Sequence, residues 1–182
     1  DWSSDVCSSD LIQGERITGV GTEADVVLPP GAEIIDARGG TILPGLIDAH
    51  VHTTWAPEVR QGFLKFGATS VCDMGSPIGH MAEFEQDTGG GEPVARGFRA
   101  GPIVTAPGGL PDAVLQANLN YEVGTLAEAR AGIEALVDSG ADVIKIYLAD
   151  TDGTKLYPAL EGQVLQALVE EAHAQGVMIR AH

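Results

Sequence analysis

Two histidines separated by one residue, His50 and His52, form the pattern in this sequence best suited to metal chemistry. They end an apolar run that starts at Leu46 and is typical of a β-strand. Side chains at positions i and i+2 of a strand point to the same face, so both imidazoles and the carboxylate of Asp48 are expected on one side. Two imidazoles at a strand end are half of a site for Zn²⁺ or a similar divalent metal. Two polar residues that simply end a strand would give the same pattern.

Lys145 lies within the apolar run Val143 to Leu148, which is typical of a strand buried on both faces. Burying an ammonium group without a partner is costly. Lys145 therefore either reaches solvent or an ion pair at the strand end, or has a lowered pKa that leaves a neutral amine. A neutral amine can add carbon dioxide and become a carbamate, an anionic ligand able to bridge two metal ions. His182 ends a similar run, and counting from the preceding glycines places it at about the height of Lys145.

Alternating strands and helices are predicted to position these side chains. Apolar residues at helical spacing indicate helices from Leu126 to Val137 and from Leu160 to Val169, each followed by a glycine that suits a helix end. Helical crossovers join parallel strands, so the chain is expected to form a parallel α/β domain, either an open sheet or a barrel. Five β units are expected, at residues 41–52, 68–74, 98–105, 142–148 and 177–182. Upstream, short antiparallel strands are expected at residues 16–20, 24–28 and 32–36.

Composition narrows the classes of protein and partner. The chain has 182 residues, of which 44% are hydrophobic and 20% charged, a balance typical of a globular protein. With 10 Lys and Arg against 26 Asp and Glu, the net charge of −16 argues against a nucleic-acid or anionic-membrane partner. No apolar run approaches the roughly 18 residues needed to span a bilayer. We therefore expect a soluble protein, with the cytoplasm favoured, that acts on a small molecule.

The first eleven residues, Asp1 to Leu11, have the sequence expected from translation of a short-read sequencing adapter. A disordered terminus rich in Ser and Asp is the alternative interpretation. Segments of such origin are excluded from fold reasoning. We accordingly expect a gene fragment cut at both ends, whose protein sequence proper starts at residue 12 and contains Cys72 as its single cysteine.

The segment Thr41-Ile-Leu-Pro-Gly-Leu-Ile-Asp-Ala-His-Val-His52 resembles the first-strand signature of the amidohydrolase superfamily of metal-dependent hydrolases. Residues 30–40 are similar to the lead-in that members carry. Residues 140–146 resemble the fourth strand of members with a carboxylated lysine, and residues 176–182 resemble the fifth strand. The imidazolonepropionase-like and prolidase-like branch is the most similar.

This resemblance implies a distorted (β/α)₈ barrel of the TIM type with a small β-sandwich built from both chain ends. Residues 12–40 are then the N-terminal part of the sandwich, and residues 41–182 are the first five β/α units of the barrel. A typical barrel of this type needs about 250 residues. We therefore expect a partial barrel in this chain.

The resemblance also implies roles for four residues. His50 and His52 bind the more buried of two divalent metal ions, for which zinc is expected. Carboxylated Lys145 bridges the two ions and counts as the catalytic residue, and His182 binds the second ion. Members add a His on strand six and an Asp on strand eight, which lie beyond His182. The chain of 182 residues is therefore expected to show no turnover by itself.

The implied reaction is hydrolysis of an amide-like C–N bond, in a cyclic amide, a dipeptide or a related compound, by a metal-activated water. Two alternatives stay open. One is a non-catalytic homologue that keeps the barrel as a scaffold, because fold alone does not imply function. The other is a mononuclear deaminase of the same superfamily, which the presence of Lys145 disfavours.

Three further residues have two interpretations each. Arg180 shares the face of His182 one layer deeper, where an ion pair with Asp48 would explain its charge. Tyr147 shares the face of Lys145 and either reaches the pocket or packs in the core. Asp73 ends the second strand, as a turn residue or as a support for the site.

Overall fold

The chain divides into two compact units, Asp1–Leu43 and Pro44–His182. The computed structural model describes residues 9–22, 24–88, 92–148 and 156–182. Each unit is considered by itself.

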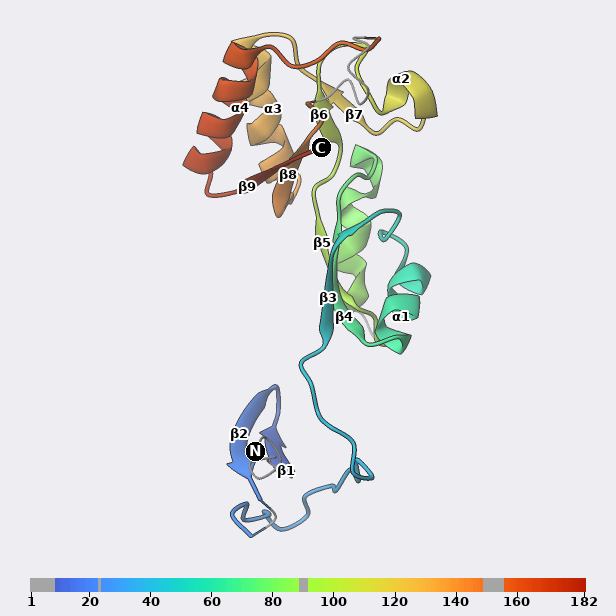
Figure 1. The fold of residues 1–182 in the computed structure, drawn as a ribbon, viewed down its shortest axis with the longest axis vertical. Helices are drawn as coiled ribbons and strands as arrows, with labels where there is room; N and C mark the ends of the chain where they lie inside the picture. The colour runs from blue at the N-terminus through green and yellow to red at the C-terminus, as the bar shows by residue number, and fades with distance from the viewer. Residues whose placement is uncertain (1–8, 23, 89–91, 149–155) are drawn as a thin grey trace, which may run out of the picture. The chain divides into compact units, whose positions relative to one another are not determined.

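The first unit contains one antiparallel hairpin, formed by β1 (Ser9–Gln13) and β2 (Arg16–Gly21). Gly14 lies in the turn between them with φ of +61°, a value that glycine adopts without steric cost. Residues 9–11, which the sequence analysis set apart, form the first part of β1 (Figure 1). The part of residues 12–40 that the structure describes thus holds a hairpin, and no sandwich is seen there.

The strands predicted at residues 24–28 and 32–36 are wrong, because neither stretch is a strand in the structure. A strand requires a hydrogen-bonded neighbour, and the backbone bonds described here close local turns instead, such as Ala32 N–H to Pro29 O at 3.1 Å. Without a neighbouring element their apolar side chains stay in water, with Ile34 74% and Ile35 85% exposed.

The second unit alternates strands and helices, as predicted. Its strands are β3 (Leu46–Val51), β4 (Ala68–Asp73), β5 (Arg96–Arg99), β6 (Ile103–Thr105), β7 (Asn120–Glu122), β8 (Val143–Ile146) and β9 (Met178–Ala181). Its helices are α1 (Pro57–Lys65), α2 (Asp112–Leu115), α3 (Leu126–Asp138) and α4 (Gly162–Ala174), with a 3₁₀ helix η1 (Ile78–Thr88). β7, α1, α2 and η1 were not predicted.

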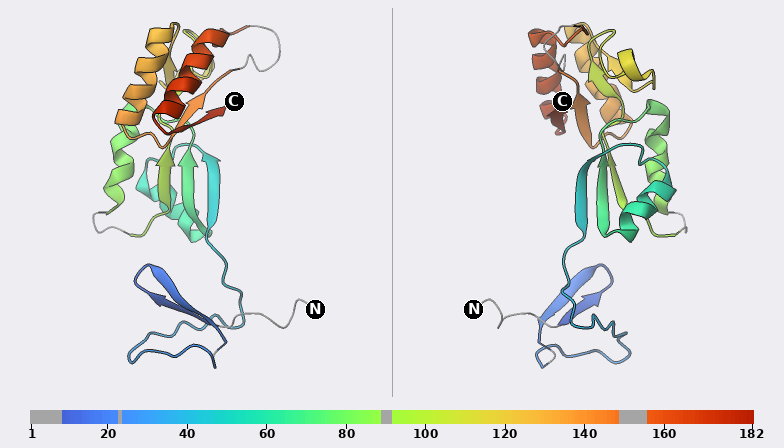
Figure 2. Two further views of the ribbon diagram at one scale, coloured as in Figure 1. Left: turned by 90° about the vertical axis from the view of Figure 1, so that its left-hand side faces the viewer. Right: turned by 45° about the vertical axis from the view of Figure 1, so that its right-hand side comes forward.

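Every pair among the described strands of this unit is parallel, which confirms the predicted sheet type. The strand orders are β3-β4-β5 in one sheet and β7-β6-β8-β9 in the other. α3 and α4 pack together against one face of the second sheet (Figure 2). Among the described strands the two sheets do not close on themselves, so the barrel stays a prediction.

The strand predicted at residues 98–105 is split into β5 and β6. Gly101, with φ of +71°, and Pro102 interrupt it, since neither continues a regular strand easily. The two halves bond to different neighbours: Ala100 N–H donates to Asp73 O at 2.8 Å in the first sheet, and Ile103 N–H donates to Leu119 O at 2.7 Å beside the second. The split therefore bends one continuous segment that connects the two sheets.

Local sequence signals explain where the helices begin and end. α3 starts with a capping box, in which Thr125 Oγ1 accepts from the backbone of Glu128 at 3.2 Å and the Glu128 carboxylate accepts from Thr125 N–H at 3.0 Å. The hydrogen bonds from Gly124 and Thr125 lower the pKa of Glu128. Gly140 and Gly176 follow α3 and α4 with φ of +90° and +75°, the left-handed conformation expected after a helix.

The largest core lies between α3, α4 and the second sheet. Both helices bury the faces that their apolar spacing predicted. Its fully buried members include Val104, Ile133, Leu136, Ile144 and Leu168.

Leu136→Ala should lower the free energy of unfolding by about 2–5 kcal/mol, because the substitution leaves a cavity in this core. Leu126→Ala on the same helix is the matched control. Leu126 is 46% exposed, so its loss should cost about 0.5 kcal/mol or less. Denaturant titration of both variants measures the difference. Equal losses would contradict the buried face assigned to α3.

Candidate metal centre

The two histidines of the H-x-H pattern lie together at the end of β3. His50 is within the strand and His52 follows its last residue, with ring centroids 5.3 Å apart. The pairing of β3 with β4 shifts between Asp48 and Val51, so the strand is irregular where the histidines lie. The Asp48 carboxylate accepts a hydrogen bond from His50 N–H at 3.2 Å. Both imidazoles are exposed, which leaves them accessible to a ligand.

Lys145 is buried in β8, with 3% of its surface exposed. Burial, and then the charge of Arg180, lower the pKa of its ammonium group from the usual 10.5. Within the part of the chain that the structure describes, no carboxylate forms an ion pair with it. This burial argues against a solvated lysine, and a neutral amine becomes accessible at a lower pH than for an ordinary lysine.

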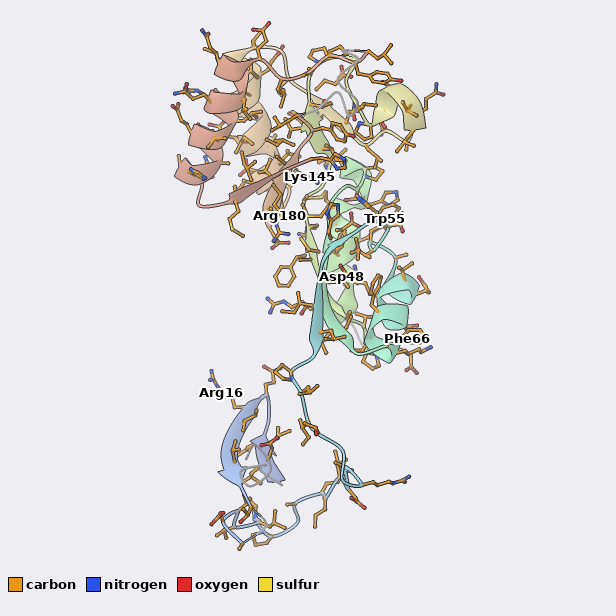
Figure 3. The ribbon with its side chains drawn as sticks, in the orientation of Figure 1. Arg16, Asp48, Trp55, Phe66, Lys145 and Arg180 are labelled. Atoms are coloured by element: carbon orange, nitrogen blue, oxygen red, sulfur yellow. The ribbon has the colours of Figure 1, made fainter. Side chains whose placement is uncertain are left out.

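Arg180 connects β9, at one edge of the second sheet, with β3, at one edge of the first. Its Nη1 donates to Ala49 O at 3.1 Å, so a side chain of β9 binds the backbone of β3 beside His50. The ion pair predicted between Arg180 and Asp48 is wrong, because the guanidinium binds this neighbouring carbonyl instead. Arg180 and Lys145 are paired in the register of β8 and β9 (Figure 3).

His182 follows β9, and its backbone pairs with β8 through His182 N–H to Ile146 O at 3.0 Å. Its ring stacks on Tyr147, with centroids 4.5 Å apart and planes 12° apart. Tyr147 thus supports a candidate ligand.

The sequence places Lys145 and His182 at about the same height on their strands. In the structure Lys145 is level with Arg180, two residues before His182, so Lys145 and His182 lie one layer apart. The cause is that β9 starts one residue sooner after its glycine than β8 does. Two residues along a strand span about 6.6 Å, a distance that the four-carbon stem of lysine can bridge.

The other three predicted ligands all affect the pKa of His50. Loss of solvent around its ring lowers its pKa, and the charges of Lys145, His52 and His182 lower it further. A lowered pKa favours the neutral imidazole, which is the form that binds metal.

The donor set fits a metal in part. In the described ranges no three His, Cys, Asp or Glu side chains gather into a metal-binding group. The histidine pair supplies two donors, and further donors have to come from a carboxylated Lys145 and from His182. The chemistry of these four groups suits Zn²⁺ or a similar ion.

Sequence reasoning missed the polar contacts behind the histidines. The Asp73 carboxylate, which is fully buried, binds Thr54 in the loop after β3. His80 lies 2.7 Å from the Glu83 carboxylate and stacks on Trp55, with ring centroids 4.7 Å apart. A strand-end Asp followed by a tight turn was the single signal for the Asp73 contact.

Lys145→Met should make stability less dependent on pH in the alkaline range. The folded pKa of Lys145 lies below the unfolded value near 10.5, so the cost of the buried ammonium is complete below the folded pKa and vanishes above 10.5. Between these limits the wild-type chain should gain stability relative to the variant as the pH rises. Denaturant unfolding in carbonate-free, chelator-treated buffers from neutral pH to pH 10.5 measures the difference. A difference that stays constant with pH would contradict the lowered pKa.

These elements define an α/β protein with parallel strands whose carboxyl ends carry histidines beside a buried lysine. The chain belongs to the amidohydrolase family, whose family model matches residues 41–182. The resemblance recognised in the sequence is thereby confirmed.

Relatives with assigned names share a short stretch of the chain. An imidazolonepropionase from Anaeromyxobacter dehalogenans (strain 2CP-C) is 48% identical over 50 residues, which are 26% of this chain and 12% of the relative. An N-substituted formamide deformylase from Arthrobacter pascens is 48% identical over 48 residues, 25% of this chain and 9% of the relative. The matches thus span a small part of each relative.

Solved structures are similar over most of the chain. A prolidase in complex with N-methylphosphonate-L-proline superposes with a TM-score of 0.73 at 24% identity, covering 94% of this chain and 50% of that one. A crystal structure of another amidohydrolase gives a TM-score of 0.75 at 23% identity, covering 95% and 50%. This likeness shows the fold, and the chain spans about half the length of these structures. No helix among the described residues is both long and apolar enough to cross a bilayer.

Proposed function

We propose that this chain carries four ligands of a metal-dependent hydrolase that cleaves an amide-like C–N bond. His50 and His52 hold one divalent metal ion, carboxylated Lys145 bridges it to a second, and His182 binds that second ion. The observation that carries the proposal is the position of Lys145, buried, without a carboxylate partner among the described residues, and close enough to affect the pKa of His50. Family membership supports the same chemistry.

Carboxylation of Lys145 fits its surroundings. The neutral amine nitrogen adds to the carbon of carbon dioxide and releases one proton, which gives a carbamate with one negative charge. Arg180 is level with Lys145 on the neighbouring strand, where its positive charge opposes an ammonium and favours an anion. The same cation therefore acts in favour of both the neutral amine and its carboxylated product.

Contacts within the protein restrain two of these histidines. The His50 backbone N–H is bound by Asp48, and the His182 ring is held flat against Tyr147. A divalent ion held by these residues would supply an activated water molecule and polarise a carbonyl group. We propose cyclic amides and dipeptides as substrates. We add N-substituted formamides because one relative is named an N-substituted formamide deformylase.

The test uses a version of the protein extended to the length of its solved relatives. It should contain bound metal by elemental analysis and hydrolyse the C–N bond of at least one of these three substrate classes. A dipeptide or formamide gives a separate amine and carboxylate, whereas a cyclic amide opens to one product that carries both groups. Chelation should remove activity and Zn²⁺ should restore it. A correctly folded, extended protein that binds no divalent metal would overturn the proposal and leave the scaffold interpretation.

A further inference from the structure

The loop that follows His52 is held by a buried carboxylate on the neighbouring strand. Asp73, at the end of β4, has no exposed surface. Its Oδ2 accepts hydrogen bonds from Thr54 N–H at 2.7 Å and from Thr54 Oγ1 at 2.9 Å. Its Oδ1 accepts from Gly75 N–H at 3.1 Å. One side chain thus fixes two separate loops at the carboxyl ends of β3 and β4.

Thr54 is fixed from its other side by a second buried residue. Arg60 of α1 has no exposed surface, and its Nη1 donates to Thr54 O at 2.7 Å. The Arg60 guanidinium also lies over the ring of Phe84, 5.0 Å from its centroid. The N–H, the hydroxyl and the carbonyl of Thr54 are therefore all bonded inside the protein, two residues after His52.

The backbone of the residue between His52 and Thr54 is strained. Thr53 has φ of +62°, a left-handed conformation that costs a β-branched residue about 1–3 kcal/mol and persists only where the surroundings impose it. Its Oγ1 donates to His52 O at 2.6 Å. Because the anchored Thr54 imposes the strain, releasing Thr54 should let the backbone relax and carry His52 with it.

The second loop held by Asp73 forms the wall behind the His52 ring. A Cβ added to Gly75 would lie 3.4 Å from His52 Cε1, about ordinary contact distance, and 2.9 Å from Ile103 Cδ1, so Gly75 lies next to the imidazole and packs tightly against Ile103. Asp73 thus fixes the chain that carries the ring through Thr54 and the surface against which it rests through Gly75.

We propose that Asp73 is a positioning residue, which acts through Thr54 and Gly75 to hold the His52 imidazole in the orientation needed to bind metal. The inference rests on the proposed function, because that function makes His52 a ligand. It adds a residue that contacts no metal to the group that builds the site. Residues that orient ligands in this indirect way typically contribute about 10- to 100-fold to metal affinity.

The test compares Asp73→Asn with Asp142→Asn in the 182-residue chain. Asparagine keeps one acceptor and places an NH₂ group against one of the former donors, so either the Thr54 or the Gly75 contact is lost. Asp142 is the matched control, because its carboxylate also accepts a backbone bond, from Arg99 N–H at 2.9 Å, but it precedes β8 and its hydrogen bond is to neither Thr54 nor Gly75. Thermal unfolding reports the stability lost by each variant.

Two measurements report on the site. Titration with Zn²⁺ should show affinity about 10- to 100-fold weaker for Asp73→Asn and unchanged for Asp142→Asn. NMR of the histidine ring protons without metal should show a shifted or broadened His52 signal for Asp73→Asn alone, with the His173 signal unchanged. Thr54→Ser keeps the hydroxyl donor and should behave as the wild type, whereas Thr54→Val should change the His52 signal in the same direction as Asp73→Asn.

The two readouts separate the possible failures. If the wild-type chain binds no Zn²⁺, the metal role of His52 fails. A His52 signal displaced by Asp73→Asn still supports the positioning of the ring by Asp73. If Asp73→Asn leaves both the ring signal and the affinity at wild-type values, the positioning role is wrong. If Asp73→Asn fails to fold, identical His52 signals in Thr54→Val and Thr54→Ser would also show that the positioning role is wrong.

Discussion

Lys145→Ala should abolish the uptake of carbon dioxide at the candidate metal centre and, with it, the binding of a second metal ion. The proposed bridging ligand is the carbamate of this lysine, and alanine offers no amine to carboxylate. Removing residues that merely orient a metal ligand already costs about 10- to 100-fold in affinity, so loss of the bridge itself should cost more than 100-fold for the second ion. Activity of the extended protein should fall with it.

Carbon-13 NMR of the chain in labelled bicarbonate measures the carbamate directly. The wild type should show one carbamate signal that strengthens as divalent metal is added, and Lys145→Ala should show none. Lys65→Ala is the matched control, because Lys65 lies in the last turn of α1, away from the histidines. It should keep the signal and the metal content.

A small carboxylate offers a second check on the same role. The space left by the Lys145 side chain can admit formate or acetate, whose two oxygens replace those of the carbamate. Such an anion should partly restore binding of the second ion in Lys145→Ala and have no effect on the wild type. Full metal content and activity in Lys145→Ala without any added carboxylate would refute the bridging role.

Much of the second unit could be predicted because its signals are local. The apolar spacing of α3 and α4 identifies their buried faces, and the glycines after them mark where each strand begins. The break within residues 98–105 has a local signal, the Gly101-Pro102 pair, but the sequence does not show that β5 and β6 pair in different sheets. Pattern alone also gave residues 24–28 and 32–36 strands, although a strand depends on a partner elsewhere in the chain.

The candidate site shows the same division. The four candidate ligands could be proposed from their types, from their places near strand ends and from the resemblance to a known family, and their metal role stays a prediction. The contacts that hold them, Arg180 to Ala49 and Asp73 to Thr54, join residues 131 and 19 positions apart. Sequence spacing cannot show which buried polar groups meet across such distances, since tertiary packing decides it.

The scaffold and mononuclear alternatives make different demands on these residues. A scaffold has no use for a buried lysine beside an arginine, an arrangement that costs stability at neutral pH. A mononuclear site can use the histidine pair without a carbamate. Labelled carbon dioxide bound at Lys145 would therefore separate the binuclear hydrolase from both.

Replacing His50 and His52 together by Gln should eliminate Zn²⁺ binding while the fold survives. Both imidazoles are exposed and 5.3 Å apart, so they supply the first donors to any ion and little of the core. Glutamine amides are poor zinc ligands, and affinity should fall by more than 100-fold, beyond the 10- to 100-fold effect of indirect supports. The substitutions should change the free energy of unfolding by about 0.5 kcal/mol or less in the absence of metal.

Competition between the chain and a coloured zinc chelator measures this loss. His173→Gln is the matched control, since His173 is exposed in the last turn of α4 and belongs to no predicted ligand set. Single substitutions of His50 or His52 test whether one histidine binds an ion without the other. Because His52 is held by the Asp73 contacts and His50 by its strand, each single variant should retain weak binding of one ion, whereas the double variant should retain none. Unchanged Zn²⁺ affinity in the double variant would place any metal site elsewhere in the protein and remove the basis for the bridge at Lys145.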